Sequence, residues 1–157
     1  MADTEIKFDN RKATKFFAGM SKKLGDVTER DKAYMGVVAA IMIKDVTKHF
    51  EKQQGPKSKW ERWSDFYDKH MKAIGKGGNN ILQDTGNLKL NIRETNIRKN
   101  PLGIELFNPA KTRSGFPYAK AHDEGLGDLP ERQFMWLSRK AAESISKVTL
   151  AFIVKGK

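Results

Sequence analysis

The sequence predicts an α+β domain in which N-terminal helices and a C-terminal helix pack on a small antiparallel β-sheet. In the first half of the chain and at its C-terminal end, apolar residues recur at steps of three and four, which is the period of a helical face. In the middle they alternate with polar residues, which is the period of a half-buried strand. Helices grouped around a short run of strands are typical of the α+β class.

The N-terminal part is predicted to contain a short strand and two helices. Ile6–Phe8 is the strand, and a helix that Asp9 or Asn10 caps follows it and runs to about Leu24, where Gly25 stops it. A longer helix is predicted over residues 28–53. Its apolar face is made of Met35, Val38, Met42, Val46 and Phe50.

A further helical stripe is predicted after the break at Gln53–Pro56. It consists of aromatic and apolar residues: Trp60, Trp63, Phe66 or Tyr67, Met71 and Ile74. Packing in the core is the preferred interpretation of this stripe, and a base-stacking platform for nucleic acid is the alternative. Gly75–Asn80 is predicted to be a mobile loop, since it lacks the Gly-Lys-Ser/Thr ending of a phosphate-binding Walker loop.

A β-hairpin is predicted in the middle of the chain. Its first strand covers residues 88–92, with an extension to Ile97 left open, and its second covers residues 102–106. Arg98–Pro101 is the turn between them. Asp84-Thr85-Gly86 resembles the triplet of aspartic proteases, but that fold requires a β-rich chain. We therefore interpret residues 84–86 as a turn that starts the first strand.

The last predicted element is a C-terminal helix, after loops at Asn108–Pro117 and Gly125–Pro130 and a short mixed segment at Tyr118–His122. Ser138 lies near its start. Because residues 148–154 include several β-branched residues, a strand is the alternative interpretation of this segment, but the helix is preferred. Its apolar face is made of Phe134, Leu137, Ala141, Ile145, Val148 and Phe152.

Length and composition favour a single domain over residues 1–157, with enough apolar residues for a core. The N-terminus has no signal-like pattern and no run is long enough to span a membrane, so we expect a cytoplasmic protein. Cysteine is absent, which excludes disulfides and thiolate chemistry. The net charge of +11 is spread evenly, with +6 in residues 1–80 and +5 in residues 81–157. Solubility or contact with proteins is the preferred reason for this charge, and contact with DNA is the alternative.

Catalytic and metal-binding patterns are weak in this sequence. Of its three histidines, none pairs with another at the spacing of a helical metal site. His122-Asp123-Glu124 is the one compact polar cluster, and it could hold a general base or a weakly bound metal. No nucleophile with a matching base is evident. The expectation is a protein that is not an enzyme and that needs no cofactor or metal.

Three stretches, at residues 81–92, 118–125 and 129–138, resemble in this order the motifs of the phage Mu-like virion morphogenesis (gpG-like tail completion) family. Residues 81–92 resemble its threonine-glycine signature, with Asn91 in place of the usual serine. Residues 118–125 resemble its tyrosine-to-histidine element, with Ala121 in place of a branched residue. Residues 129–138 resemble its proline–arginine–phenylalanine element, with Gln133 for proline and Trp136 for glycine. The long helix, Gly55-Pro56 and Trp60 extend the resemblance over residues 26–146.

The resemblance implies a virion structural protein that acts in tail completion or in head–tail joining at the neck, as a subunit of a ring, possibly a hexamer. Implied partners are copies of itself, other tail and neck proteins and packaged DNA, and the implied location is the virion. A nucleic-acid-binding module is the alternative function. The motif residues expected to matter are Trp60, Thr85, Gly86, Leu88, Tyr118, His122, Gly125, Pro130, Arg132 and Phe134.

Four of these motif residues, Tyr118, His122, Arg132 and Phe134, are expected to pack together around the turn-rich loop. Phe134 would be buried, while Arg132 would remain available for a neighbour's carboxylate or a backbone carbonyl. Two alternatives remain open for these four residues: they stabilise the fold of the monomer only, or they lie at a subunit interface.

Overall fold

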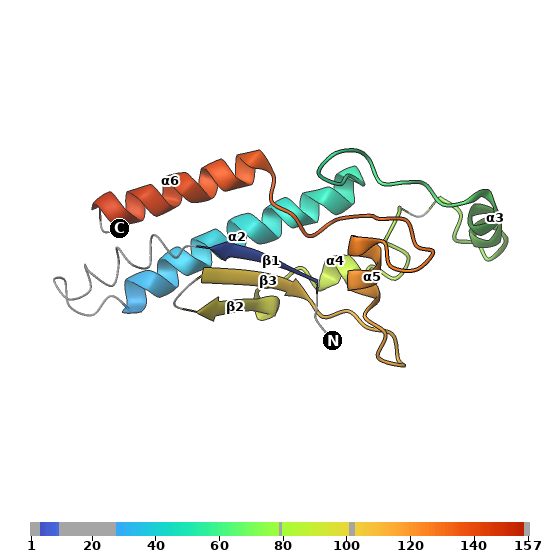
Figure 1. Cartoon of the computed structure of the whole chain (residues 1–157), viewed down its shortest axis with the longest axis horizontal. Helices are drawn as coiled ribbons and strands as arrows, with labels where there is room; N and C mark the ends of the chain where they lie inside the picture. Colours follow the sequence, from blue (N-terminus) through green and yellow to red (C-terminus); the bar gives the residue numbers. More distant parts are fainter. Residues whose placement is uncertain (1–3, 10–27, 79, 101–102, 156–157) are drawn as a thin grey trace.

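The computed structural model describes residues 4–9, 28–78, 80–100 and 103–155 (Figure 1). This part combines helices with a three-stranded antiparallel sheet, which confirms the predicted α+β class. The elements in chain order are β1 (Thr4–Asp9), α2 (Thr28–Lys52), α3 (Asp65–Ala73), α4 (Asn87–Leu90), η1 (Glu94–Asn96), β2 (Ile97–Asn100), β3 (Gly103–Asn108), α5 (Tyr118–Glu124) and α6 (Arg139–Lys155).

The sheet has the order β1-β3-β2, so β3 is its central strand. Leu106 of β3 lies opposite Ile6 on one side and opposite Ile97 on the other. Ile104 and Leu106 are buried, and both belong to the main hydrophobic core. The strand predicted at Ile6–Phe8 is thus confirmed, as is a hairpin that ends in β3.

Helix α2 is the middle of three layers, with the sheet on one side and α6 on the other (Figure 1). Helix α6 runs antiparallel to it. Near one end of the pair the Tyr34 hydroxyl lies 2.8 Å from that of Thr149, and near the other the Asp45 carboxylate accepts from Ser138. A helix covered on two sides needs a broad apolar face. The predicted long helix is confirmed.

The strand predicted over residues 88–92 is wrong. Gly86 takes a left-handed conformation, with φ at 71°, and the short helix α4 follows it. Leu88 and Ile92 are buried, whereas Leu90, between them, is 69% exposed. A strand would bury all three residues on one face, whereas a helical turn buries only the first and the last. The Asn91 side chain donates back to the Asn87 carbonyl at 2.9 Å. Such local bonds replace the ladder of a strand, so the first strand of the hairpin is β2.

Asn96 strengthens this local network before β2 begins. It is buried, and its side chain donates to the Asn91 carbonyl at 2.8 Å. Because β2 covers Ile97–Asn100, most of the turn predicted at Arg98–Pro101 is strand, and that prediction is also wrong.

Two predicted helices have different ends in the structure, and one segment predicted to be mixed is a helix. Helix α6 begins at Arg139, so Phe134 and Leu137 precede it, although its continuation through residue 154 confirms helix over strand there. Helix α3 is shorter than the predicted stripe, and Trp60 and Trp63 lie in the loop before it. The segment that begins at Tyr118 forms the helix α5.

Two predicted segments remain partly or wholly untested. The helix predicted to run to Leu24 lies outside the described residues. The described part of Gly75–Asn80 forms turns, as a loop would, but its predicted mobility is not tested.

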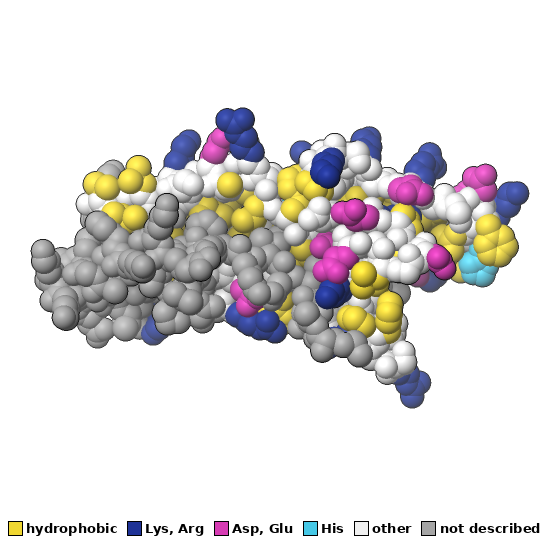
Figure 2. Space-filling view, in the orientation of Figure 1, with side chains coloured by type: hydrophobic (Ala, Val, Ile, Leu, Met, Phe, Trp, Pro, Cys, Tyr) yellow, Lys and Arg dark blue, Asp and Glu magenta, His cyan; other side chains and the backbone are white. Residues whose placement is uncertain are grey.

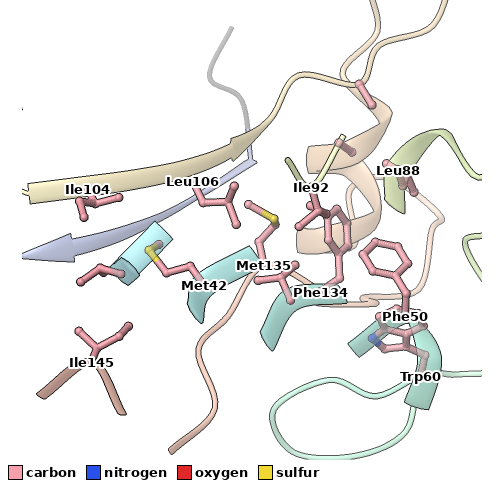
Figure 3. Close-up of a cluster of buried hydrophobic side chains, with 14 of the residues drawn as sticks. Met42, Phe50, Trp60, Leu88, Ile92, Ile104, Leu106, Phe134, Met135 and Ile145 are labelled. Atoms are coloured by element: carbon pink, nitrogen blue, oxygen red, sulfur yellow. The ribbon is translucent and has the colours of Figure 1, made fainter. Parts of the chain in front are cut away.

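The aromatic part of the core joins segments that are far apart in the sequence (Figure 3). The Phe50 ring meets Trp60 edge-on, with centroids 5.5 Å apart, and lies 5.1 Å from the Phe134 ring. Aromatic pairs at these distances are stabilising beyond the area they bury. They hold the end of α2, the loop before α3 and the segment before α6 together.

Candidate interaction site

The segment before α6, residues 131–138, has no regular secondary structure, and its main chain is bound by buried side chains. Asp123 of α5 accepts from the amides of Phe134 and Met135 through one carboxylate oxygen, at 2.7 and 2.8 Å. The indole nitrogen of Trp60 donates to the Gln133 carbonyl at 3.0 Å. We call residues 131–138 the connector. Its polar main chain stays buried because side chains supply the missing hydrogen bonds.

Asp123 is the strongest electrostatic feature of this region. Burial raises its pKa to about 6, although the two connector amides pull that pKa down and the charges of Glu124 and Glu131 push it further up. A perturbed carboxylate can indicate a functional site. Here its hydrogen bonds to the two connector amides serve the fold. The sequence marked residues 122–124 as a polar cluster but not which member is buried.

Arg132 is buried and binds the loop that precedes α3. Its Nε donates to the Glu61 carbonyl at 2.9 Å and its Nη2 donates to the Arg62 carbonyl at 3.3 Å. Burial lowers the pKa of Arg132, while Glu61 and Tyr67 raise it. Of the two partners that the sequence allowed, a backbone carbonyl is thus the observed one, and it lies within the same chain.

His49 of α2 holds the other side of the connector. Its Nδ1 lies 2.9 Å from the Phe134 carbonyl, so the nitrogen must donate. Its ring stacks on Trp136, with centroids 4.1 Å apart. Burial lowers the pKa of His49, an effect that the bond to Phe134 and the nearby Asp45 oppose. Sequence reasoning missed this role, because nothing local distinguishes His49 from a solvated histidine.

The expected group of Tyr118, His122, Arg132 and Phe134 is formed only in part. The His122 carbonyl accepts from the Arg132 amide at 2.8 Å. Burial and the charge of Arg132 lower the His122 pKa. Phe134 is fully buried. The Tyr118 hydroxyl instead meets the side chain of Asn87.

Gly125 and Gly86 have structural reasons to be glycine. Gly125 has φ at 66°, and an added Cβ would lie 2.9 Å from the Glu131 amide nitrogen. Gly86, with φ at 71°, begins α4, and the hydroxyl of Thr85 accepts from the Asn87 amide at 3.4 Å. The turn predicted over residues 84–86 is therefore present, but it leads into α4 and not into the predicted strand. Of the remaining motif residues, Leu88 and Trp60 are buried and Pro130 is half-buried.

An apolar surface lies at the end of the molecule formed by α3 (Figure 2). Phe66 is 84% exposed there, and Tyr67 and Ile74 are also exposed. His70, tilted against the Tyr67 ring at 6.4 Å, completes what we call the α3 patch. The core interpretation was therefore wrong for Phe66, for its alternative Tyr67 and for Ile74, although Met71 and Trp60 are buried. Sequence spacing alone could not distinguish the exposed residues from the buried ones, because both faces of α3 carry large apolar side chains.

A second apolar surface lies at the opposite end, on the last turns of α6 (Figures 1 and 2). Leu150 is 62% exposed and Val154 is 71% exposed. We call these two residues the α6 patch. Exposed apolar surface of this kind often marks a site of protein association.

The described residues offer a weaker case for a small-molecule or metal site than for a site of protein association. An open hollow of about 560 Å³ beside α3 is lined mainly by polar groups, including Arg62, Asp65 and Asp68. Within the described residues, no three potential metal ligands come together. The described helices include none long and apolar enough to cross a membrane.

Comparison with known proteins gave no match to a protein-family model, a curated protein or a solved structure.

Proposed function

We propose that this chain is a structural subunit of a phage virion that acts in tail completion or in head–tail joining at the neck. The observation that carries the proposal is the α3 patch, because an aromatic side chain as exposed as Phe66 is costly to leave in water. The three motif stretches support the phage assignment. Their Gly86, Gly125 and Arg132 each have a specific task in the fold, as residues of a structural signature would.

The proposed assembly is a ring of identical chains. A ring needs two different surfaces on each chain that fit one another by a repeated rotation. The α3 patch and the α6 patch meet this requirement, because they are apolar and lie at opposite ends of an elongated molecule (Figure 1). In this arrangement, the α3 patch of one copy covers the α6 patch of the next.

Light scattering on the purified chain and its variants tests the ring. The wild type is expected to form a discrete multiple, near six chains, whereas Phe66→Ser and Val154→Ser should each remain monomeric. A mixture of these two variants should give two-chain complexes and nothing larger, because only one intact pair of patches remains. Leu90→Ser, which removes from α4 a side chain about as exposed as Val154, should assemble normally.

Three outcomes would contradict the ring. Assembly of Phe66→Ser like the wild type, or equal damage from Leu90→Ser, would remove the role of the two patches. A monomer at every concentration would contradict a ring that forms free in solution.

The virion assignment needs a separate test on particles. Antibody labelling of particles purified from cells that carry the encoding genome should place the chain at the tail or neck. Absence of the chain from those particles would overturn the proposed function, whatever its state in solution.

A further inference from the structure

The fold gathers positive charge that is evenly spread along the sequence. Helices α2 and α6 lie side by side, which brings residues 44–60 and residues 139–147 to one margin of the molecule (Figures 1 and 2). We call their exposed basic residues the basic ridge. The ridge consists of Lys44, Lys48, Lys52, Lys57, Lys59, Arg139, Lys140 and Lys147.

The charge on the ridge is dense. Its two segments contain eight basic and three acidic residues in 26 positions, a net +5, while the other 131 positions together carry +6. An even distribution between the two halves of the sequence therefore hides a local excess. Only the packing of α6 on α2 brings the two segments together.

The three acidic residues in these two segments neutralise only part of the ridge. Asp45 is directed at the connector, where it accepts from the amide and the hydroxyl of Ser138, both at 2.7 Å. Glu143 pairs with Arg139 at 2.9 Å, and Glu51 lies 3.8 Å from Lys89, outside the ridge. Among the described residues, no ion pair is recorded for Lys44, Lys48, Lys140 or Lys147.

We infer that the basic ridge binds the phosphate backbone of a nucleic acid, without reading its sequence. Lys44, Lys48 and Lys52 are spaced one helical turn apart, about 6 Å along the axis of α2. A regular row of flexible ammonium groups suits a regular row of phosphates, and lysine binds phosphate as a point charge. The α6 residues extend this row along the molecule, because Ser138 bonds to Asp45 and Thr149 bonds to Tyr34, which places residues 139–147 beside the part of α2 that precedes Lys48. A nucleic-acid strand presents phosphates at a regular spacing along its length, which an acidic protein surface does not.

This inference does not depend on the proposed function. The ridge residues are distinct from both apolar patches, so association of the chains and binding of nucleic acid can be measured and lost separately.

Fluorescence anisotropy of a labelled, mixed-sequence DNA duplex tests the ridge. The wild type should bind with a log–log salt slope of several, since each neutralised phosphate contributes about 0.9. Lys44→Gln/Lys48→Gln/Lys140→Gln should reduce that slope by about 3. The matched control, Lys69→Gln/Arg93→Gln/Arg113→Gln, removes the same charge from exposed positions elsewhere and should change the slope little.

Two results would overturn the inference. Equal losses in the two triple variants would show that only net charge attracts the duplex. Polyglutamate that binds the ridge more tightly than the duplex, at equal charge, would assign the ridge to an acidic protein instead. Circular dichroism of both variants excludes unfolding as the cause of any loss.

Discussion

The guanidinium of Arg132 donates to the main-chain carbonyl of Glu61 at 2.9 Å, across 71 positions of sequence. Through this bond and the one to Arg62, the connector fixes the loop that leads into α3. The exposed α3 patch is therefore positioned by a buried cation. Arg132 thus stabilises the fold directly, and it can contribute to an interface only by fixing the position of α3.

Replacement of Arg132 tests this link. Arg132→Ala leaves two carbonyls without their partner, so we expect a loss of about 2 to 4 kcal/mol in the free energy of unfolding. Urea denaturation measures it. Arg113→Ala, at an exposed loop position, should change stability by less than about 0.5 kcal/mol. A small effect of Arg132→Ala would mean that other contacts hold α3 in place.

Asp123 should make the protein less stable as the pH rises through the weakly acidic range. Its pKa is about 6 in the folded chain against 3.8 in the reference state, so the folded state binds more protons between these values. Stability contributed by the protonated form is present below about pH 4 and is lost by about pH 6. The size of this effect is on the order of 3 kcal/mol.

Asp123→Asn keeps an acceptor for the two connector amides but cannot ionise. Denaturation at a series of pH values should show that this variant lacks the decline assigned to Asp123, while Asp128→Asn, at an exposed position whose charge does not shift the Asp123 pKa, keeps it. An unchanged pH profile for Asp123→Asn would refute the assignment.

His49 should act in the opposite direction. Burial holds its folded pKa below the ordinary 6.5, so the unfolded chain binds the proton more readily and stability falls as the pH drops below that value. His49→Asn retains an N–H donor for the Phe134 carbonyl and removes this titration. NMR titration of the His49 ring in the wild type checks the prediction directly, and a pKa above 6.5 would contradict it.

Substitution of two glycines by alanine tests the backbone strain at Gly125 against an unstrained control at Gly36. Gly125→Ala places a Cβ against the Glu131 main chain at a positive φ, so a loss of about 2 kcal/mol or more is expected. Gly36→Ala lies within α2 in open space, and it should stabilise the protein by about 0.5 to 1 kcal/mol. Thermal denaturation of both variants is the measurement. A gain in stability for Gly125→Ala would show that the turn can relax.

Much of the secondary structure could be predicted because its patterns are long. The stripe of α2 repeats over several turns, and in β3 the buried Ile104 and Leu106 alternate with less buried residues. The failure at residues 88–92 has a specific cause. Over five positions, buried Leu88 and Ile92 fit a strand and a helix equally well, and the choice rests with Gly86 and the side chains of Asn91 and Asn96.

The candidate sites were less predictable than the fold. Phe66 and Met71 both fit one apolar stripe, yet the first is exposed and the second is buried. Asp123, Arg132 and His49 all bind a main chain that lies at least eleven positions away. Spacing within a segment carries no information about such partners.

By itself, the sequence determined the α+β class, the long helix, the hairpin that ends in β3 and the glycine turns, because these depend on local periodicity and local backbone freedom. Tertiary structure alone decided which apolar residues remain in water, which polar groups are buried and where the charge collects. Those properties depend on which surfaces cover one another. Helix α6 on α2 buries one face of each helix and brings their lysines to one margin of the molecule, and neither effect exists in either segment alone.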